Sequence, residues 1–131
     1  MIRRFLIAAP LLLLLTSGHS ADAADPARRY AVFFSSWSAK IDKQGEGVIA
    51  KAVAWAKAHP DHSLLVHGFA STIGSAPANK LLSALRAQMV SDALETAGLP
   101  HERITRDAEG ATAFAMDPQE SRRVEIIFTG P

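Results

Sequence analysis

The feature that most constrains the fold is one long, sharply delimited helix pattern in the second half of the chain. Ser75 is a preferred N-cap residue, and Pro77 is tolerated in the first turn of the helix that follows. Gly98 suits the left-handed C′ position, and Pro100 stops the helix shortly afterwards. The pattern therefore predicts a helix from Ser75 to Gly98, with strand-like segments before and after it.

These neighbouring segments make the chain alternate between strands and helices. Apolar and β-branched runs predict four strands and an irregular connection: strands at 30–34, 63–70, 103–110 and 122–128, and the connection at 111–120. A first helix is expected between an N-cap at Asp42 and the stop at Pro60. Gly68 predicts a point where another group approaches the second strand. The order βαβαββ favours an α+β fold, a two-layer sandwich with its helices on one face of the sheet.

The first 23 residues are predicted to be a secretory signal peptide. Arg3 and Arg4 form its basic start, an apolar run follows, and Ala21-Asp22-Ala23 is a small-x-small cleavage site. The apolar run is shorter than the roughly 20 residues that a membrane-spanning helix needs, so no stable membrane insertion is expected after cleavage. The predicted division is a signal peptide at 1–23, a short lead at 24–29 and one domain at 30–131.

Charge and cysteine content exclude several classes of function. Cleavage after Ala23 would remove two arginines and one aspartate from 14 basic and 13 acidic residues, which leaves twelve of each. A neutral chain without a basic block is not suited to neutralising phosphates, so no nucleic-acid partner is expected. The absence of cysteine excludes disulfides, zinc–thiolate sites and lipid attachment at an N-terminal cysteine.

An arginine interrupts the apolar stripe of the long helix. At 100° per residue, the expected apolar face comprises Leu82, Leu85, Met89, Val90 and Ala93. Arg86 falls inside the same arc. Asn79, Ser83 and Arg86 form one polar stripe along the edge of this face, so their side chains can converge on one object.

A guanidinium in such a position needs a partner, because an unpaired buried charge costs several kcal/mol. The partner of Arg86 can be a carboxylate, a set of carbonyl oxygens or a ligand. The acids considered within the chain are Asp107, Glu109 and Glu125. The residue pattern leaves both an internal partner and a ligand open.

The same stretch resembles the OmpA-like family of peptidoglycan-binding domains. The family pattern, roughly G-[HYF]-T-D-x-x-G-S-x-x-x-N-x-x-L-S-x-x-R-A-x-x-V, is matched by Gly68, Phe69, Gly74, Ser75, Asn79, Leu82, Ser83, Arg86, Ala87 and Val90. A later family segment, N-R-R-V-E, corresponds to residues 121–125, and I-x-x-x-G-x-G is matched in part by Ile104 and Gly110. The resemblance extends from Val32 to Phe128.

The resemblance implies a non-catalytic, cofactor-free domain of the Gram-negative periplasm, associated with the cell wall or outer membrane. Its groove would hold the diaminopimelate residue of a peptidoglycan stem peptide. The family's arginine and asparagine map onto Arg86 and Asn79, and Phe69, Ser71 and Thr72 lie on the facing loop. An arginine fork binds a carboxylate bidentately, which suits the carboxylates of this ligand.

One position departs from the family pattern, because Ala70-Ser71 replaces its T-D. Ser71 offers no negative charge to the ammonium of the ligand. A neutral hydrogen bond contributes about 1 kcal/mol against about 1.5 to 3 for a charge-assisted one, so a loss of about tenfold in affinity is expected. The alternative is a degenerate OmpA-like module, in which Arg86 pairs internally and the partner is another envelope protein rather than peptidoglycan.

Other chemistry has weaker support in the sequence. The spacing of His59, His62 and His67 does not favour a metal site. The chain has no G-x-S-x-G nucleophile elbow, so an enzyme is not expected. Trp55 is expected in the core, whereas Trp37 is left open between packing and stacking on a glycan.

Overall fold

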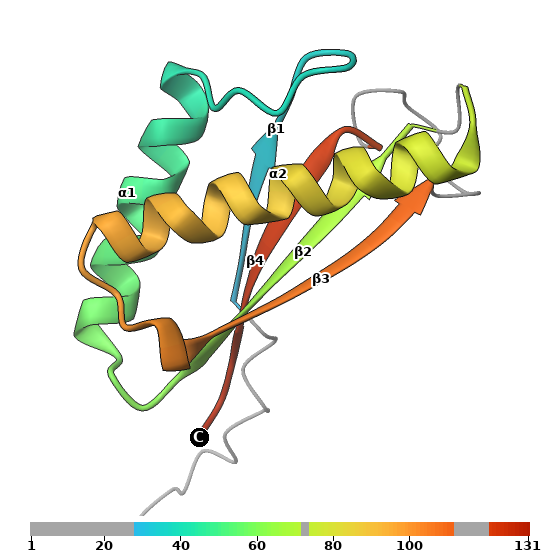
Figure 1. Ribbon diagram of the computed structural model, residues 1–131. Helices are drawn as coiled ribbons and strands as arrows, with labels where there is room; N and C mark the ends of the chain where they lie inside the picture. The colour runs from blue at the N-terminus through green and yellow to red at the C-terminus, as the bar shows by residue number, and fades with distance from the viewer. Residues whose placement is uncertain (1–27, 72–73, 112–120) are drawn as a thin grey trace, which may run out of the picture.

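Four strands form one mixed sheet in the computed structural model, which describes residues 28–71, 74–111 and 121–131 (Figure 1). The elements are β1 (Arg29–Phe33), α1 (Lys43–Ala58), β2 (Ser63–Ala70), α2 (Ala76–Thr96), the 3-10 turn η1 (His101–Arg103), β3 (Ile104–Ala111) and β4 (Arg123–Thr129). The predicted order βαβαββ is confirmed. The predicted signal peptide and nearly all of the predicted connection lie outside the described residues.

The strand order β1–β4–β2–β3 places the last strand of the chain inside the sheet. β4 pairs antiparallel with both β1 and β2, whereas β2 and β3 are parallel. Parallel neighbours need a long crossover, and α2 supplies it. The ladder between β2 and β3 shifts register between Gly68 and Phe69, near the end of β2 where the candidate site lies.

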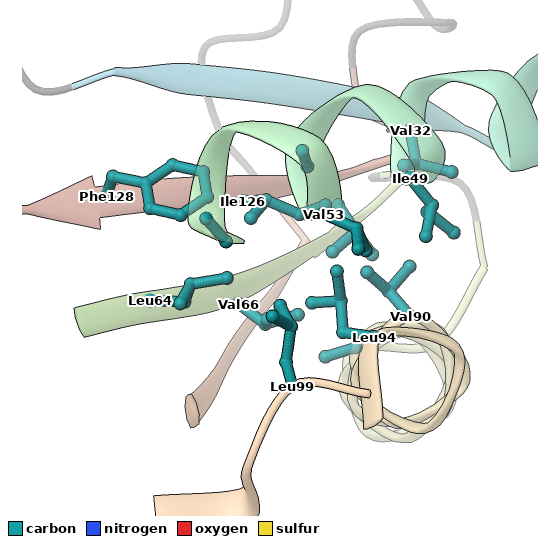
Figure 2. Close-up of a cluster of buried hydrophobic side chains, with 14 of the residues drawn as sticks. Val32, Ile49, Val53, Leu64, Val66, Val90, Leu94, Leu99, Ile126 and Phe128 are labelled. Atoms are coloured by element: carbon teal, nitrogen blue, oxygen red, sulfur yellow. The ribbon is translucent and has the colours of Figure 1, made fainter. Parts of the chain in front are cut away.

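Both helices cover the same face of the sheet, as predicted, and the core lies between the two layers (Figures 1 and 2). Alternate residues of β4 point into it, and the largest buried apolar side chains include Val32, Leu64, Val66, Val90, Leu94, Ile126 and Phe128. Trp55 of α1 packs against this cluster, which confirms its predicted place. Within the described part of the chain, no helix combines the length and the apolar character that crossing a membrane requires.

The predicted helix ends are confirmed by their capping contacts. Asp42 accepts a hydrogen bond from the backbone N–H of Gly45 at 2.8 Å, which caps α1. Ser75 accepts one from the backbone N–H of Ala78 at 3.2 Å, which caps α2. Gly98 follows α2 with φ of 105°, a left-handed conformation that favours glycine.

The predicted apolar face of α2 is confirmed at Val90 and Ala93, which pack in or against the core, and is wrong at two other positions. Leu85 and Met89 are 49% and 40% exposed. The buried face instead carries Asn79, Ser83, Arg86, Ala87, Val90, Ser91 and Leu94. The helix approaches β2 so closely that a Cβ atom on Gly68 would lie 2.2 Å from the carbonyl oxygen of Ser83, and this confirms the predicted approach at Gly68. Small residues, Ser83 and Ala87, therefore stand where the helix meets Gly68, and Arg86 lies within the buried face rather than at its edge.

Candidate functional site

A small cavity of about 40 Å³ lies between the loop after β1, the end of β2 and the first turns of α2. Its lining residues are Ser36, Trp37, Ser71, Asn79, Leu82, Arg86 and Arg122. Three of the five predicted site residues, Ser71, Asn79 and Arg86, are thus brought together. The volume is suited to a group no larger than a carboxylate or a few water molecules.

Arg86 is fully buried and donates hydrogen bonds to three backbone carbonyl oxygens. Its Nε donates to Ser38 at 2.8 Å, one terminal nitrogen donates to Ser35 at 3.0 Å, and the other donates to Phe69 at 3.4 Å. Ser35 and Ser38 bound the turn that carries Trp37, whereas Phe69 belongs to β2. The guanidinium therefore ties the loop after β1 to the end of β2.

Although Arg86 donates three hydrogen bonds, its surroundings disfavour the charged form of its guanidinium. Burial, and then the nearby positive charge of Arg122, lower the pKa of Arg86 from its ordinary value to about 10. The side chain remains protonated at neutral pH, and the guanidinium carbon lies 5.3 Å from the centre of the Phe34 ring. An anion in the cavity would favour the charged form and oppose both effects.

The described acids proposed as internal partners of Arg86 have other partners. Asp107 pairs with His67 at 3.2 Å. Glu125 pairs with Arg29 at 3.2 Å and with Arg123 at 3.1 Å. The side chain of the third candidate, at position 109, lies outside the described set. Of the partners predicted for Arg86, the structure therefore shows carbonyl oxygens, and the prediction of Asp107 or Glu125 is wrong.

The three residues of the predicted polar stripe on α2 do not all reach the cavity. Asn79 is 1% exposed, and its side-chain nitrogen donates to the carbonyl oxygen of Ser75 at 3.0 Å, which fixes the orientation of the amide. Ser83 is also buried, but its hydroxyl donates back to the carbonyl oxygen of Lys80 at 2.8 Å and does not line the cavity. Asn79 and Arg86 therefore meet at the cavity, and Ser83 does not join them.

Of the two other predicted residues, Phe69 does not add its side chain to the cavity. The ring of Phe69 packs against His67, with ring centres 4.5 Å apart, and beneath the guanidinium of Arg123 at 4.0 Å. Phe69 takes part at the cavity only through its carbonyl oxygen, the acceptor of Arg86. Thr72 lies outside the described residues.

Trp37 and Arg122 also line the cavity, although neither was among the five predicted site residues. Arg122 donates from Nε to the carbonyl oxygen of Phe34 at 3.2 Å, and it brings a second guanidinium to the cavity. Trp37 is 59% exposed and has a positive φ of 53°. A Cβ atom on Gly74 would lie 2.8 Å from the indole of Trp37, so only glycine leaves room for the ring there. The twin arginines of residues 122–123 were a visible signal, whereas the conformation of Trp37 had none.

The histidines considered for metal binding have other contacts. His59 stacks on Trp55 with ring centres 3.8 Å apart, and His62 meets the same ring edge-on at 5.0 Å. His67 lies at a different place, beside Asp107. Across residues 28–71, 74–111 and 121–131, no three histidine or acidic side chains are grouped so as to hold a metal ion.

The chain belongs to the OmpA family, whose family model matches residues 33–125. Members of this family are generally non-catalytic binding domains. The confirmed sequence motif and the observed two-layer fold agree with this assignment.

Solved structures of related proteins have the same fold. The peptidoglycan-associated lipoprotein of Burkholderia pseudomallei is 22% identical with a TM-score of 0.70, and the match covers 76% of this chain and 90% of that chain. The OmpA-like domain of FopA1 from Francisella tularensis is 28% identical with a TM-score of 0.72, over 79% and 72% of the two chains. The periplasmic domain of Helicobacter pylori MotB is 19% identical with a TM-score of 0.67, over 79% and 74%. No curated protein sequence matches the chain significantly.

Proposed function

We propose that this domain binds peptidoglycan non-covalently in the periplasm, with the diaminopimelate residue of a stem peptide at the cavity. The observation that carries the proposal is the meeting of Ser71, Asn79, Arg86 and Arg122, from three separate segments, around one small cavity. Membership of the OmpA family supports it, as does the likeness to a lipoprotein that is named for its association with peptidoglycan.

The chemistry of the lining suits a carboxylate. A guanidinium has five N–H donors, and Arg86 uses three of them on carbonyl oxygens, which leaves two for a ligand. Arg122 uses its Nε in the same way and has its terminal amino groups for the same anion. Charge-assisted bonds of this kind contribute about 1.5 to 3 kcal/mol each, more than neutral ones. Asn79 would orient the rest of the ligand.

The facing loop would complete the contact with neutral groups. The hydroxyls of Ser71 and Thr72 are proposed to accept hydrogen bonds from the ligand, and Phe69 is proposed to act through the carbonyl oxygen that holds Arg86. Because Ser71 carries no charge, this side of the ligand would be bound more weakly than its carboxylate.

Sedimentation with purified sacculi tests the proposal. The wild-type protein is expected to pellet with the sacculi, and Arg122→Gln to stay largely in the supernatant because one of two cations at the cavity is lost. Arg103→Gln is the control for loss of an arginine that donates to backbone carbonyl oxygens, since Arg103 donates to three of them but does not line the cavity. The proposal is abandoned if the wild-type protein does not pellet and Ser71→Asp does not restore pelleting.

One observation favours a second candidate, a degenerate module that binds another envelope protein. All three nitrogens of Arg86 already donate to the chain itself, so the fold does not need a ligand to satisfy them. Under this alternative, neither the wild-type protein nor Ser71→Asp would pellet with sacculi, and cross-linking in the envelope would join the domain to a protein partner.

A further inference from the structure

Trp37 occupies a costly position beside the cavity. It is the one non-glycine residue with a positive φ among those that the structure describes, and tryptophan gains nothing intrinsic from that conformation. The residue is 59% exposed although its side chain is large and mostly apolar. Residues held in such conformations with exposed side chains cluster at binding sites, where the surrounding structure enforces them.

The surrounding structure holds the turn of Trp37 from both ends. Arg86 donates to the carbonyl oxygens of Ser35 and Ser38, and the backbone N–H of Ser38 donates to Ser35 at 3.2 Å. On the other side of the ring, Gly74 leaves space that any Cβ atom would fill. The buried guanidinium therefore fixes the turn that presents the indole to the cavity, and Arg86 is a positioning residue for Trp37.

The charges at the cavity favour one of the two charged groups of a ligand that carries both a carboxylate and an ammonium group. Arg86 and Arg122 suit the carboxylate, but both repel the ammonium. The described lining residues include no carboxylate, and Ser71 offers only a neutral oxygen. The face of an indole is the best aromatic partner for a cation, and Trp37 lines the same cavity.

We infer that Trp37 contacts the ligand directly, by receiving the ammonium group of diaminopimelate against its indole ring, in the role that a carboxylate would otherwise take. This inference rests on the proposed function and specifies which residue recognises the second charge of the ligand. It also explains how a site without an acidic side chain at position 71 could retain a ligand with two kinds of charge.

The test uses graded fluorination of the indole, which withdraws electron density from the ring face with little change in shape. The chain has two tryptophans, so the full-length mature protein is made with Trp55→Phe and fluorinated tryptophans are incorporated at position 37. The probe is a diaminopimelate-containing stem tripeptide, titrated by calorimetry. Its counterpart with an acetylated diaminopimelate amine is titrated in parallel.

Affinity for the tripeptide is expected to fall stepwise with each added fluorine, and by about tenfold in Trp37→Leu. Trp37→Phe should be intermediate, and Trp37→Leu combined with Ser71→Asp should recover affinity. The acetylated peptide should bind more weakly and show no dependence on fluorination. Phe33→Leu is the control for loss of an exposed aromatic ring, because Phe33 is 40% exposed and does not line the cavity.

Two results overturn the inference while leaving the proposed function intact. If the affinity for the tripeptide does not change with fluorination, although Trp37→Leu lowers that affinity, the indole acts only as a packing surface. Equal affinity for the acetylated peptide would show that the cavity recognises a carboxylate alone. If the proposed function itself is wrong, the wild-type protein will bind neither the tripeptide nor sacculi, which distinguishes that outcome from the two above.

Discussion

Two arginines make the same kind of contact at opposite ends of β2. Arg86, near the end of the strand, donates to the carbonyl oxygens of Ser35, Ser38 and Phe69. Arg103, near its start, donates to the carbonyl oxygens of Ala56, His59 and His62 at 2.7 to 2.9 Å. By hydrogen bonds alone, the two residues could not be told apart.

Their surroundings separate them. The acceptors of Arg103 lie in and just after the last turn of α1, where free carbonyl groups and the helix dipole favour a cation. The acceptors of Arg86 lie in a loop and a strand, the side chain is fully buried, and a second guanidinium lies close enough to lower its pKa. Arg103 caps a helix, whereas Arg86 forms the wall of a cavity. An anion beside Arg86 would offset both its desolvation and the nearby like charge.

The largest expected effect comes from Arg86→Ala. The substitution leaves three carbonyl acceptors without their donor and a cavity where the side chain was, so a loss of about 3 to 5 kcal/mol in the free energy of unfolding is expected. Urea unfolding followed by circular dichroism measures it. A loss below about 1 kcal/mol would mean that the loop after β1 does not depend on this guanidinium.

A smaller loss in the free energy of unfolding is expected from a substitution that displaces α2 without removing the side chain of Arg86. Gly68→Ala would place a Cβ atom 2.2 Å from the carbonyl oxygen of Ser83, a backbone atom that cannot turn aside. The helix must shift, at a cost of about 1 to 3 kcal/mol. Arg86 moves with it, so binding to sacculi should weaken as well. Gly47→Ala in α1 is the control, since nothing lies within 4 Å of the added atom.

Arg103→Ala should separate stability from binding. Loss of the three hydrogen bonds to the end of α1 is expected to cost about 1 to 2 kcal/mol, because this site is only partly buried and water can replace the donor. Unfolding in urea measures the cost, and sedimentation with sacculi should match the wild-type protein at a temperature where both are folded. Reduced sedimentation would show that the two arginines are not functionally distinct.

The elements could be predicted from the sequence because their signals are local. The caps at Asp42 and Ser75 involve backbone groups three residues away, and Gly98 needs only its own conformation. The buried face of α2 was predicted correctly at Val90 and wrongly at Leu85 and Met89, because its position depends on another element. Gly68, on β2, lets the helix backbone come close, and this favours small side chains over Leu85 and Met89.

The site was predictable only where a motif marks it. Ser71, Asn79 and Arg86 could be placed through the family pattern, whereas the partners of Arg86 could not. Two of these partners lie 48 and 51 residues away, and they are backbone carbonyls, which every residue type carries. The place of Trp37 at the cavity depends on a positive φ that tryptophan rarely adopts, so the sequence left its position open between packing and stacking.

The smallest expected effect is a dependence of stability on pH at the end of the sheet where Arg103 lies. The hydrogen bond that the His101 ring donates to the carboxylate of Glu95 at 2.5 Å, and then the charge of that carboxylate, raise the pKa of His101, which lies in the same turn as Arg103. A raised folded-state pKa stabilises the fold below the unfolded value of 6.5, and this contribution is lost as pH rises through the folded value. In Glu95→Gln, an NMR titration should show the pKa of His101 closer to 6.5. The small loss of stability that the wild-type protein shows as pH rises should then be absent. Binding at the cavity should not follow the same transition, because Arg86, with a pKa of about 10, keeps its proton throughout. A binding curve that followed the titration of His101 would instead show that the two ends of β2 are coupled.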